Sequence, residues 1–218
     1  MVAFTQPARR VWLLARQEAE GLHHHYVGPE HLLLGLLRHG DNQAARVLRA
    51  HGLDLETTRA EVGRLVARGV LPAPRPSDDA LLATLGIDAL TVRRRLRETF
   101  GTEAVDQATQ RVRTRPIDAV PWPPMGGTPL LAKRVFRLAY HEAVARGQEV
   151  GPEHLLLGLL GDAGGPADTE LPLDQRVSAH LGLPDHDHHP VRLLVQARGL
   201  TLQALRAAVR SELDREQC

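Results

Sequence analysis

The residues that could do chemistry include two glutamate–histidine pairs, Glu30-His31 and Glu153-His154. Each pair lies in a copy of the same ten-residue string, Gly-Pro-Glu-His-Leu-Leu-Leu-Gly-Leu-Leu. The string occupies residues 28–37 and, unchanged, residues 151–160. A proline is well tolerated in the first turn of a helix, where its missing N–H costs nothing. The string therefore predicts a helix start with Glu30 and Glu153 in the first turn, where the helix dipole favours a carboxylate. On the residues alone, each glutamate is a dipole partner or loop anchor.

The candidate metal ligands in the sequence are histidines. His31 and His154 precede the apolar run, but no His-Glu-x-x-His pattern accompanies them, so we expect packing roles. The runs 23–25 and 186–189 hold three histidines each. Neighbours along an extended chain cannot all face one ion, and a metal site needs fixed supporting partners. We therefore expect adventitious binding only, with no dedicated metal site and no cofactor.

Rare residue types exclude several enzyme classes. Lys133 is the only lysine, and it lies in a helical pattern rather than after a glycine, so a phosphate-binding P-loop is excluded. None of the three serines lies in a Gly-x-Ser-x-Gly nucleophile elbow. Cys218, the only cysteine, is a poor nucleophile candidate at a frayed terminus. We predict no catalytic residues.

The overall composition is that of a soluble globular protein. Hydrophobic residues make up 43% of the chain, enough for a core, and 27 basic against 26 acidic residues give a net charge of +1. This balance does not predict a nucleic-acid partner, which would require a strongly basic domain or stripe. No signal peptide or membrane-spanning run is recognisable. With a single cysteine, these features predict a cytoplasmic protein with no membrane partner.

The duplication extends beyond the repeated string. Residues 8–19 match residues 132–143, with apolar residues at three- and four-residue steps in both segments, which predicts an amphipathic helix before each string. Glu18 and Glu142 fall on the apolar stripe, where an unpaired carboxylate would be costly. We expect each to accept hydrogen bonds from the loop before the Gly-Pro turn. Downstream, Gly52-Leu53-Asp54-Leu55 corresponds to Gly199-Leu200-Thr201-Leu202.

Each repeat is predicted to contain four helices, and no run predicts a strand. The Leu-Leu-Leu-Gly-Leu-Leu segment is apolar on all sides, so its helix is central, and Gly35 and Gly158 allow a neighbouring helix to approach closely. In repeat one, helical patterns at 42–51 and 55–68 follow, separated by a glycine cap. The fold class is therefore all-α.

A distinct middle segment separates the repeats. Residues 71–76 and 113–129 are rich in proline and read as connectors. Between them, residues 84–93 resemble residues 50–59, which indicates a third, partial copy of the second half of a repeat. The run Arg93-Arg94-Arg95-Leu96-Arg97 is a basic helical face, either solvated or a docking surface for an acidic partner.

Taken together, these motifs resemble the Clp N-terminal repeat, the module that precedes the ATPase rings of Clp/Hsp100 unfoldases, with the ClpC type most similar. The residues that carry the resemblance are Phe4-Thr5, Ala8-Arg9-Arg10-Val11, Glu18-Ala19 and His25-Tyr26-Val27 ahead of the repeated string. The resemblance implies two four-helix repeats related by a pseudo-twofold axis. The expected domains are repeat one at 1–70, the middle segment at 71–127, and repeat two at 128–218 with an insertion at 161–190.

The resemblance also implies a ligand site. In ClpC-like modules, the glutamate of this motif holds the guanidinium of phosphoarginine, a bidentate, charge-assisted contact. The corresponding residues here are Glu30 and Glu153. The phosphate is met near a Thr-x-Arg-Ala segment that begins each repeat, to which Thr5 and, shifted by one residue, Thr128 correspond.

This chain departs from the family pattern at that segment. Pro7 and Leu131 stand where the family has arginine. The phosphate-binding half of the phosphoarginine site is therefore expected to be lost. What remains are acidic pockets that could accept arginine side chains or another ligand. The remaining motif residues are expected to be structural: Gly28, Pro29, His31, Gly151, Pro152, His154, Glu18 and Glu142.

These observations favour a stand-alone, non-catalytic module that binds protein substrates, adaptors or peptidic ligands of a Clp unfoldase–protease system. Its partners would include phosphoarginine-bearing proteins or a Clp ATPase. One form of this hypothesis is a decoy that sequesters cyclic-peptide antibiotics aimed at the unfoldase. The alternatives are a hydrolase that uses histidine and acid residues, or a regulatory protein whose middle segment binds nucleic acid.

Overall fold

A computed structural model describes residues 3–24, 26–72, 82–113, 130–164 and 188–216. These residues are predominantly helical and contain no strand, only an isolated bridge between Phe4 and Val150, so the predicted all-α fold is confirmed. The helices are α1 (Gln6–Gly21), α2 (Pro29–His39), α3 (Gln43–Ala50), α4 (Leu55–Ala67), α6 (Ala89–Phe100), α7 (Thr102–Arg113), α8 (Leu130–Ala145), α9 (Pro152–Gly164), α11 (Pro190–Gln196) and α12 (Leu202–Glu216).

The chain divides into two compact units. Unit 1 combines Met1–Ala73 with Thr128–Cys218 and so contains both repeats, whereas unit 2 is the middle segment Pro74–Gly127. Helix α9 continues to Gly164, through the first residues of the predicted 161–190 insertion. Asp162 and Ala163 are buried there, which keeps the end of α9 attached to the core.

Side-chain caps fix the helix starts of repeat one. The Thr5 hydroxyl accepts a hydrogen bond from the amide of Ala8 at the start of α1. Asn42 and Asp54 accept from the amides of Ala45 and Thr57 at the starts of α3 and α4. Each cap satisfies an amide that would otherwise lack a partner in the first turn.

Two glycines bring the first two helices of each repeat into close contact. A Cβ added to Gly35 would lie 2.5 Å from the carbonyl oxygen of Val11, and one added to Gly158 would lie 2.6 Å from the carbonyl oxygen of Val135. Backbone atoms of α1 and α8 therefore occupy the space that a side chain would need. The predicted close approach is confirmed, and it makes α1–α2 and α8–α9 the two central hairpins.

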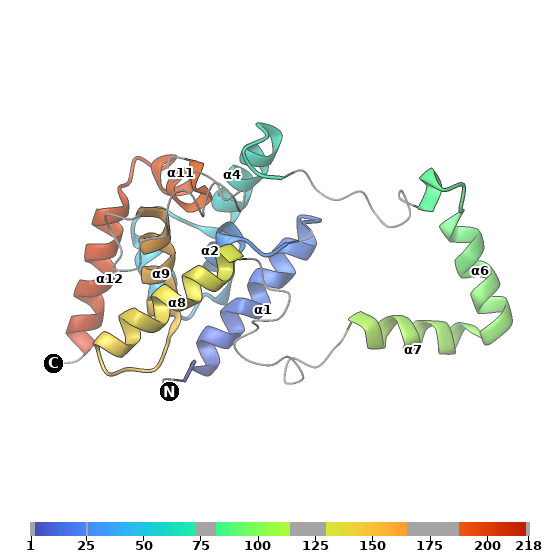
Figure 1. Ribbon diagram of the computed structural model, residues 1–218, viewed down its shortest axis with the longest axis horizontal. Helices are drawn as coiled ribbons and strands as arrows, with labels where there is room; N and C mark the ends of the chain where they lie inside the picture. Colours follow the sequence, from blue (N-terminus) through green and yellow to red (C-terminus); the bar gives the residue numbers. More distant parts are fainter. Residues whose placement is uncertain (1–2, 25, 73–81, 114–129, 165–187, 217–218) are drawn as a thin grey trace. The chain divides into compact units, whose positions relative to one another are not determined.

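The two repeats share one core with pseudo-twofold symmetry. Trp12 of α1 and Phe136 of α8 occupy equivalent positions in the two repeats and contact each other edge to face, with 5.4 Å between ring centroids. Helix α2 packs against α9, while α3 packs against α12 and α11 against α4. In Figure 1, the helices of repeat two (yellow to red) lie against those of repeat one (blue to teal).

Unit 2 contains the helices α6 and α7. The turn before α6 repeats the one before α4, since the Ile87 amide donates to the Leu82 carbonyl at 2.9 Å as the Leu53 amide donates to the Leu48 carbonyl at 2.9 Å. Asp88 then caps α6 through Leu90 and Thr91, as Asp54 caps α4 through Thr57. The turn and the helix start of α6 therefore resemble those of α4.

Candidate functional site

The two Gly-Pro-Glu-His segments form matching helix caps. The Nδ1 atom of His31 accepts a hydrogen bond from the Gly28 amide at 2.9 Å, and Nδ1 of His154 accepts one from the Gly151 amide at 3.1 Å. Each histidine therefore takes the part that glutamate or glutamine plays in a capping box. Because Nδ1 accepts, this network assigns the proton of each ring to Nε2.

The second ring nitrogen of each histidine finds a different acceptor in the two repeats. Nε2 of His31 lies 2.8 Å from Nδ1 of His24, whereas Nε2 of His154 lies 3.1 Å from the Oε1 atom of Gln148. His24 and Gln148 are equivalent, because their amides donate to the carbonyls of Ala19 and Ala143, respectively. The histidine at the helix start thus bonds to an imidazole of the loop before α2 in repeat one and to a side-chain amide of the loop before α9 in repeat two.

Glu30 and Glu153 differ in exposure although their neighbours in sequence are identical. Each carboxylate lies beside the following histidine, with Oε1 to Nδ1 distances of 3.1 Å at Glu30 and 3.0 Å at Glu153. The side chain of Glu30 is 1% exposed and that of Glu153 is 17% exposed. An incoming guanidinium could therefore reach Glu153 more easily than Glu30.

Glu30 is held in its buried place by its surroundings. Burial acts to raise its pKa, whereas its own backbone amide and the Tyr26 hydroxyl act to lower it, and the pKa lies below its usual value. Burial and the carboxylate of Glu30 raise the pKa of Tyr26. The ring of Tyr26 stacks on His24, with 5.4 Å between centroids, so these side chains form one buried polar cluster.

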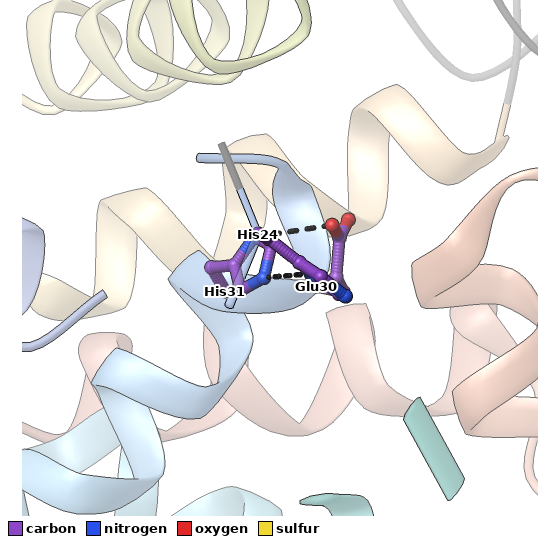
Figure 2. A group of neighbouring side chains, drawn as sticks. All are labelled: His24, Glu30 and His31. Atoms are coloured by element: carbon purple, nitrogen blue, oxygen red, sulfur yellow. Dashed lines mark hydrogen bonds and ion pairs between the residues drawn. The ribbon is translucent and has the colours of Figure 1, made fainter. Parts of the chain in front are cut away.

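His24, Glu30 and His31 are also the residues with the best geometry for a metal ion in the described parts of the chain. Figure 2 shows the three side chains gathered at the start of α2, and one ligand atom from each lies within 4.8 Å of the other two. Sequence reasoning considered the histidine run 23–25 by itself and did not join His24 to Glu30 and His31. Two of these ligand atoms, Nδ1 of His24 and Nε2 of His31, are the atoms that lie within hydrogen-bond distance of each other.

Two described histidines of these runs, His23 and His189, lie outside this cluster. His23 has a positive φ of 57° in the turn after α1, and Nε2 of His189 lies 3.1 Å from the buried carboxylate of Asp162. His25 and the pair His186-Asp187 lie outside the described residues.

The segment that begins repeat one lies beside the second Gly-Pro-Glu-His string. Thr5 donates its amide to the carbonyl of Val150 at 3.0 Å, and its hydroxyl also contacts that oxygen at 3.3 Å. Thr5 therefore belongs with the Glu153 edge rather than with Glu30. Pro7 is exposed in the first turn of α1. Thr128 lies outside the described residues, and Leu131 is described only as part of α8.

Glu18 and Glu142 do not bind the loops as expected. The carboxylate of Glu18 accepts hydrogen bonds from Arg59 at 2.7 and 2.8 Å and from Arg38 at 3.0 Å. The carboxylate of Glu142 accepts from the arginines at positions 146, 206 and 210. The loop prediction was wrong because arginines of α2 and α4 reach Glu18, and two arginines of α12 together with Arg146, directly after α8, reach Glu142.

The pKa of both carboxyl groups is lowered. Burial raises the pKa of Glu18, but the hydrogen bonds and charges of Arg59 and Arg38 outweigh it. Burial likewise opposes Arg146 and Arg210 at Glu142, and the arginines again prevail. These glutamates are structural ion-pair centres that tie the fourth helix of each repeat to the first.

Comparison with known proteins identifies the family. The family described as the Clp repeat (R) N-terminal domain matches residues 3–84. The N-terminal domain of the chaperone ClpD from Arabidopsis thaliana shares the fold, with a TM-score of 0.51, 16% identity and coverage of 97% of this chain and 94% of that one. Repeat one of this chain thus matches the Clp repeat N-terminal domain family, and the described residues share the fold of a Clp N-terminal domain. The second copy extends the match, since residues 151–160 repeat residues 28–37 without change.

Its curated relatives are much longer proteins. The chain is 50% identical over 66 residues, 30% of its length, to a probable ATP-dependent Clp protease ATP-binding subunit of Chlamydia pneumoniae. It is 32% identical over 165 residues, 75% of its length, to the chloroplastic chaperone protein ClpC1 of Arabidopsis thaliana. These matches cover 8% and 12% of the relatives. Among the described residues, no helix is long and apolar enough to cross a bilayer.

One sequence signal could have found the His24–His31 contact. Ala8 aligns with Ala132, whereas Gly28 aligns with Gly151, so the intervening loop is one residue longer in repeat one. Aligning that loop from the first helix, rather than from the repeated string, places His24 opposite Gln148. The string itself carries no such information, because it is identical in both copies.

Proposed function

We propose that this Clp N-terminal domain is a non-catalytic module that recognises protein substrates, adaptors or peptidic ligands of a Clp unfoldase–protease system. The observation that carries the proposal is the double repeat with a Gly-Pro-Glu-His helix start in each half. Each start presents a carboxylate at the positive end of a helix dipole, and its histidine is committed to capping. The site is thus built to hold a ligand in place rather than to transfer protons.

Glu153 is the primary ligand contact in this proposal. Its side chain is 17% exposed, against 1% for Glu30, and the N-terminal segment at Thr5 lines the same edge through Val150. A carboxylate of this kind pairs with a guanidinium through charge-assisted hydrogen bonds. The ligand class is therefore an arginine-bearing peptide or protein segment.

Phosphoarginine is a less favoured ligand than arginine. The Thr5 hydroxyl already accepts from the Ala8 amide and contacts the Val150 carbonyl, and Pro7 provides no cation for a phosphate. Substrates, adaptors, a Clp ATPase and arginine-mimicking cyclic peptides would all compete for the same edge. The decoy form of the function therefore differs from the adaptor form in its partner rather than in its site.

The test is a fluorescence-polarisation titration with three labelled peptides that carry arginine, phosphoarginine or alanine at one position. We expect the arginine peptide to bind and the alanine peptide to bind at least tenfold more weakly. Glu153→Gln should weaken arginine binding about tenfold, because hydrogen bonds between charged groups are each worth about 1.5–3 kcal/mol. Glu149→Gln is the matched control, since Glu149 is exposed two residues before Gly151, and it should bind like the wild type.

The comparison with Glu30→Gln locates the site. A direct contact at Glu153 predicts a smaller loss for Glu30→Gln than for Glu153→Gln in a folded protein. Equal affinity of the wild type and Glu153→Gln would contradict the assignment of the contact. If the arginine and alanine peptides bind alike, recognition of arginine is wrong.

A further inference from the structure

The middle segment carries an exposed apolar face that is not found on the described residues of the two repeats. Val92, Leu96 and Phe100 lie at four-residue steps on α6 and are 42%, 41% and 65% exposed. Among the described residues, every exposed large apolar side chain except Val144 belongs to unit 2. A contiguous exposed apolar face of this kind marks an interaction surface more often than a lone exposed leucine does.

Helix α6 corresponds to the fourth helix of each complete repeat. The three helices follow the same kind of turn, in which Gly52, Gly86 and Gly199 have φ values of 79°, 73° and 69°. Counting from these glycines, α4, α6 and α12 begin at equivalent positions. Unit 2 thus contains an equivalent of the fourth helix of a repeat and of the turn before it.

The exposed face of α6 is buried in both complete repeats. Leu96 corresponds to Val62 in α4 and to Val209 in α12, which are 0% and 1% exposed. Val92 corresponds to Thr58 and Leu205, which are 1% and 0% exposed. In those repeats, α4 packs against α2 and α12 packs against α9. The apolar face of α6 therefore corresponds to the faces of α4 and α12 that a central helix, α2 or α9, covers.

The basic side chains of α6 indicate the charge of what would cover it. Arg93 corresponds to Arg59 and Arg206, and each of these pairs with the glutamate on the first helix of its repeat. The distances are 2.8 Å from Arg59 to Glu18 and 3.4 Å from Arg206 to Glu142. Helix α6 also carries Arg94 and Arg95 with a single carboxylate, Glu98, while Arg97 pairs with Asp106 of α7 at 3.2 Å. The complementary surface is therefore apolar and acidic.

We propose that α6 is a docking site for a helical hairpin of another protein that presents an apolar helix and, on its neighbour, a carboxylate that receives Arg93. Such a hairpin has the chemistry of α1–α2, with Glu18 as the carboxylate. A second copy of this chain is a poor occupant, because its own α4 and α12 already cover its two hairpins. Direct pairing of two α6 helices would place arginines against arginines, which opposes association.

The test uses the full chain and a labelled synthetic peptide of residues 3–40, which supplies the α1–α2 sequence without its covering helices. Fluorescence anisotropy should show saturable binding to the wild type. Leu96→Asp should weaken binding at least tenfold, because it places a charge in the centre of the apolar face. Leu90→Asp is the matched control, because Leu90 is 71% exposed and corresponds to Glu56, an exposed position in α4, and it should leave the affinity unchanged.

A second pair of variants, with exchanged charges, keeps the test valid if Leu96→Asp fails to fold. Arg93→Glu should weaken binding several-fold, and a peptide with Glu18→Arg should restore it. Equal binding by Leu96→Asp and the wild type, or no restoration by the exchanged pair, would overturn the proposal. So would a dimer of the chain alone, detected by sedimentation and abolished by Leu96→Asp, because a second copy would then be the occupant. The arginine-peptide titration at Glu153 is unaffected by any of these outcomes.

Discussion

Repeats one and two contain the same ten residues in the same helix start, yet the two sites are not equivalent. In repeat one, His24, Tyr26 and His31 enclose Glu30, and its side chain is 1% exposed. In repeat two, Gln148 takes the place of His24, and Glu153 is 17% exposed. The loop preceding the string, rather than the string, decides whether the carboxylate is enclosed or accessible.

This difference separates two uses of one motif. The shared features, namely the proline, the capping histidine and the close-packed glycine, serve folding, since they act identically in both repeats. The features that differ are the ones on which ligand binding would depend. A pseudo-symmetric module can thus keep one copy of a motif as structure while the other remains available for recognition.

The largest effect is expected where the repeats are most alike. Gly35→Ala and Gly158→Ala should each lower the free energy of unfolding by about 3 kcal/mol, because the new methyl group would overlap backbone atoms of the first helix. Gly63→Ala is the control, since nothing lies within 4 Å of its added Cβ, and alanine should stabilise α4 by roughly 0.5–1 kcal/mol. Urea denaturation measures all three. A clearly smaller loss at one of the two packed glycines would break the equivalence of the hairpins.

The buried ion pairs should show a graded difference. Glu18→Gln should lower the free energy of unfolding by about 2 kcal/mol and Glu142→Gln by about 1 kcal/mol, because an arginine left without its carboxylate costs more where the site is more buried. The side chains are 4% and 18% exposed, respectively. Thermal and urea unfolding of both variants measures the ranking. The reverse ranking would mean that the three arginines around Glu142 matter more than burial.

Acid should weaken both repeats through these same carboxyl groups. The pKa of Glu18 and that of Glu142 lie below their usual value of 4.5 in the folded protein. A group of this kind stabilises the fold above its unfolded pKa, and the contribution is lost as the pH falls through the folded value. Stability should therefore decline from about pH 4.5 downward. Denaturant titrations from neutral pH into this range should give a shallower decline for Glu18→Gln; an identical decline would contradict a role for Glu18.

The sequence predicted the repeated elements well and the contacts between them poorly. The helix starts at Thr5, Pro29 and Pro152 and the close packing at Gly35 follow from local rules, since the chemistry lies within one or two turns. The partners of Glu18 could not be predicted in this way. Arg59 lies 41 residues away, and only the packing of α4 against the α1–α2 hairpin through α2 brings it near. The His24–His31 contact was missed for a different reason, because a one-residue difference in loop length conceals the equivalence with Gln148.

Replacing His24 by glutamine, the residue found at the equivalent position 148, should test that equivalence directly. His24→Gln should change stability by less than about 1 kcal/mol at neutral pH, because glutamine can accept the Nε2–H hydrogen of His31 as Gln148 accepts that of His154. His24→Ala should cost about 1–2 kcal/mol, because that buried donor would lose its acceptor. Chemical denaturation distinguishes the two. Equal losses in both variants would show that stacking on Tyr26, rather than the hydrogen bond, is what His24 contributes.

The smallest effect is expected in the turn directly before His24 and Gln148. His23 and Gly147 are equivalent when the loops are aligned from the first helix, and both have positive φ, 57° and 65°. A residue with a Cβ is strained in this region, whereas glycine is not. His23→Gly should therefore stabilise the protein by roughly 0.5–1 kcal/mol, and Gly147→His should destabilise it by a similar amount. Nothing lies within 4 Å of a Cβ added at Gly147, so crowding does not enter, and the two melting-temperature shifts should be opposite in sign. Shifts of the same sign would mean that His23 makes a contact in repeat one that outweighs its backbone strain.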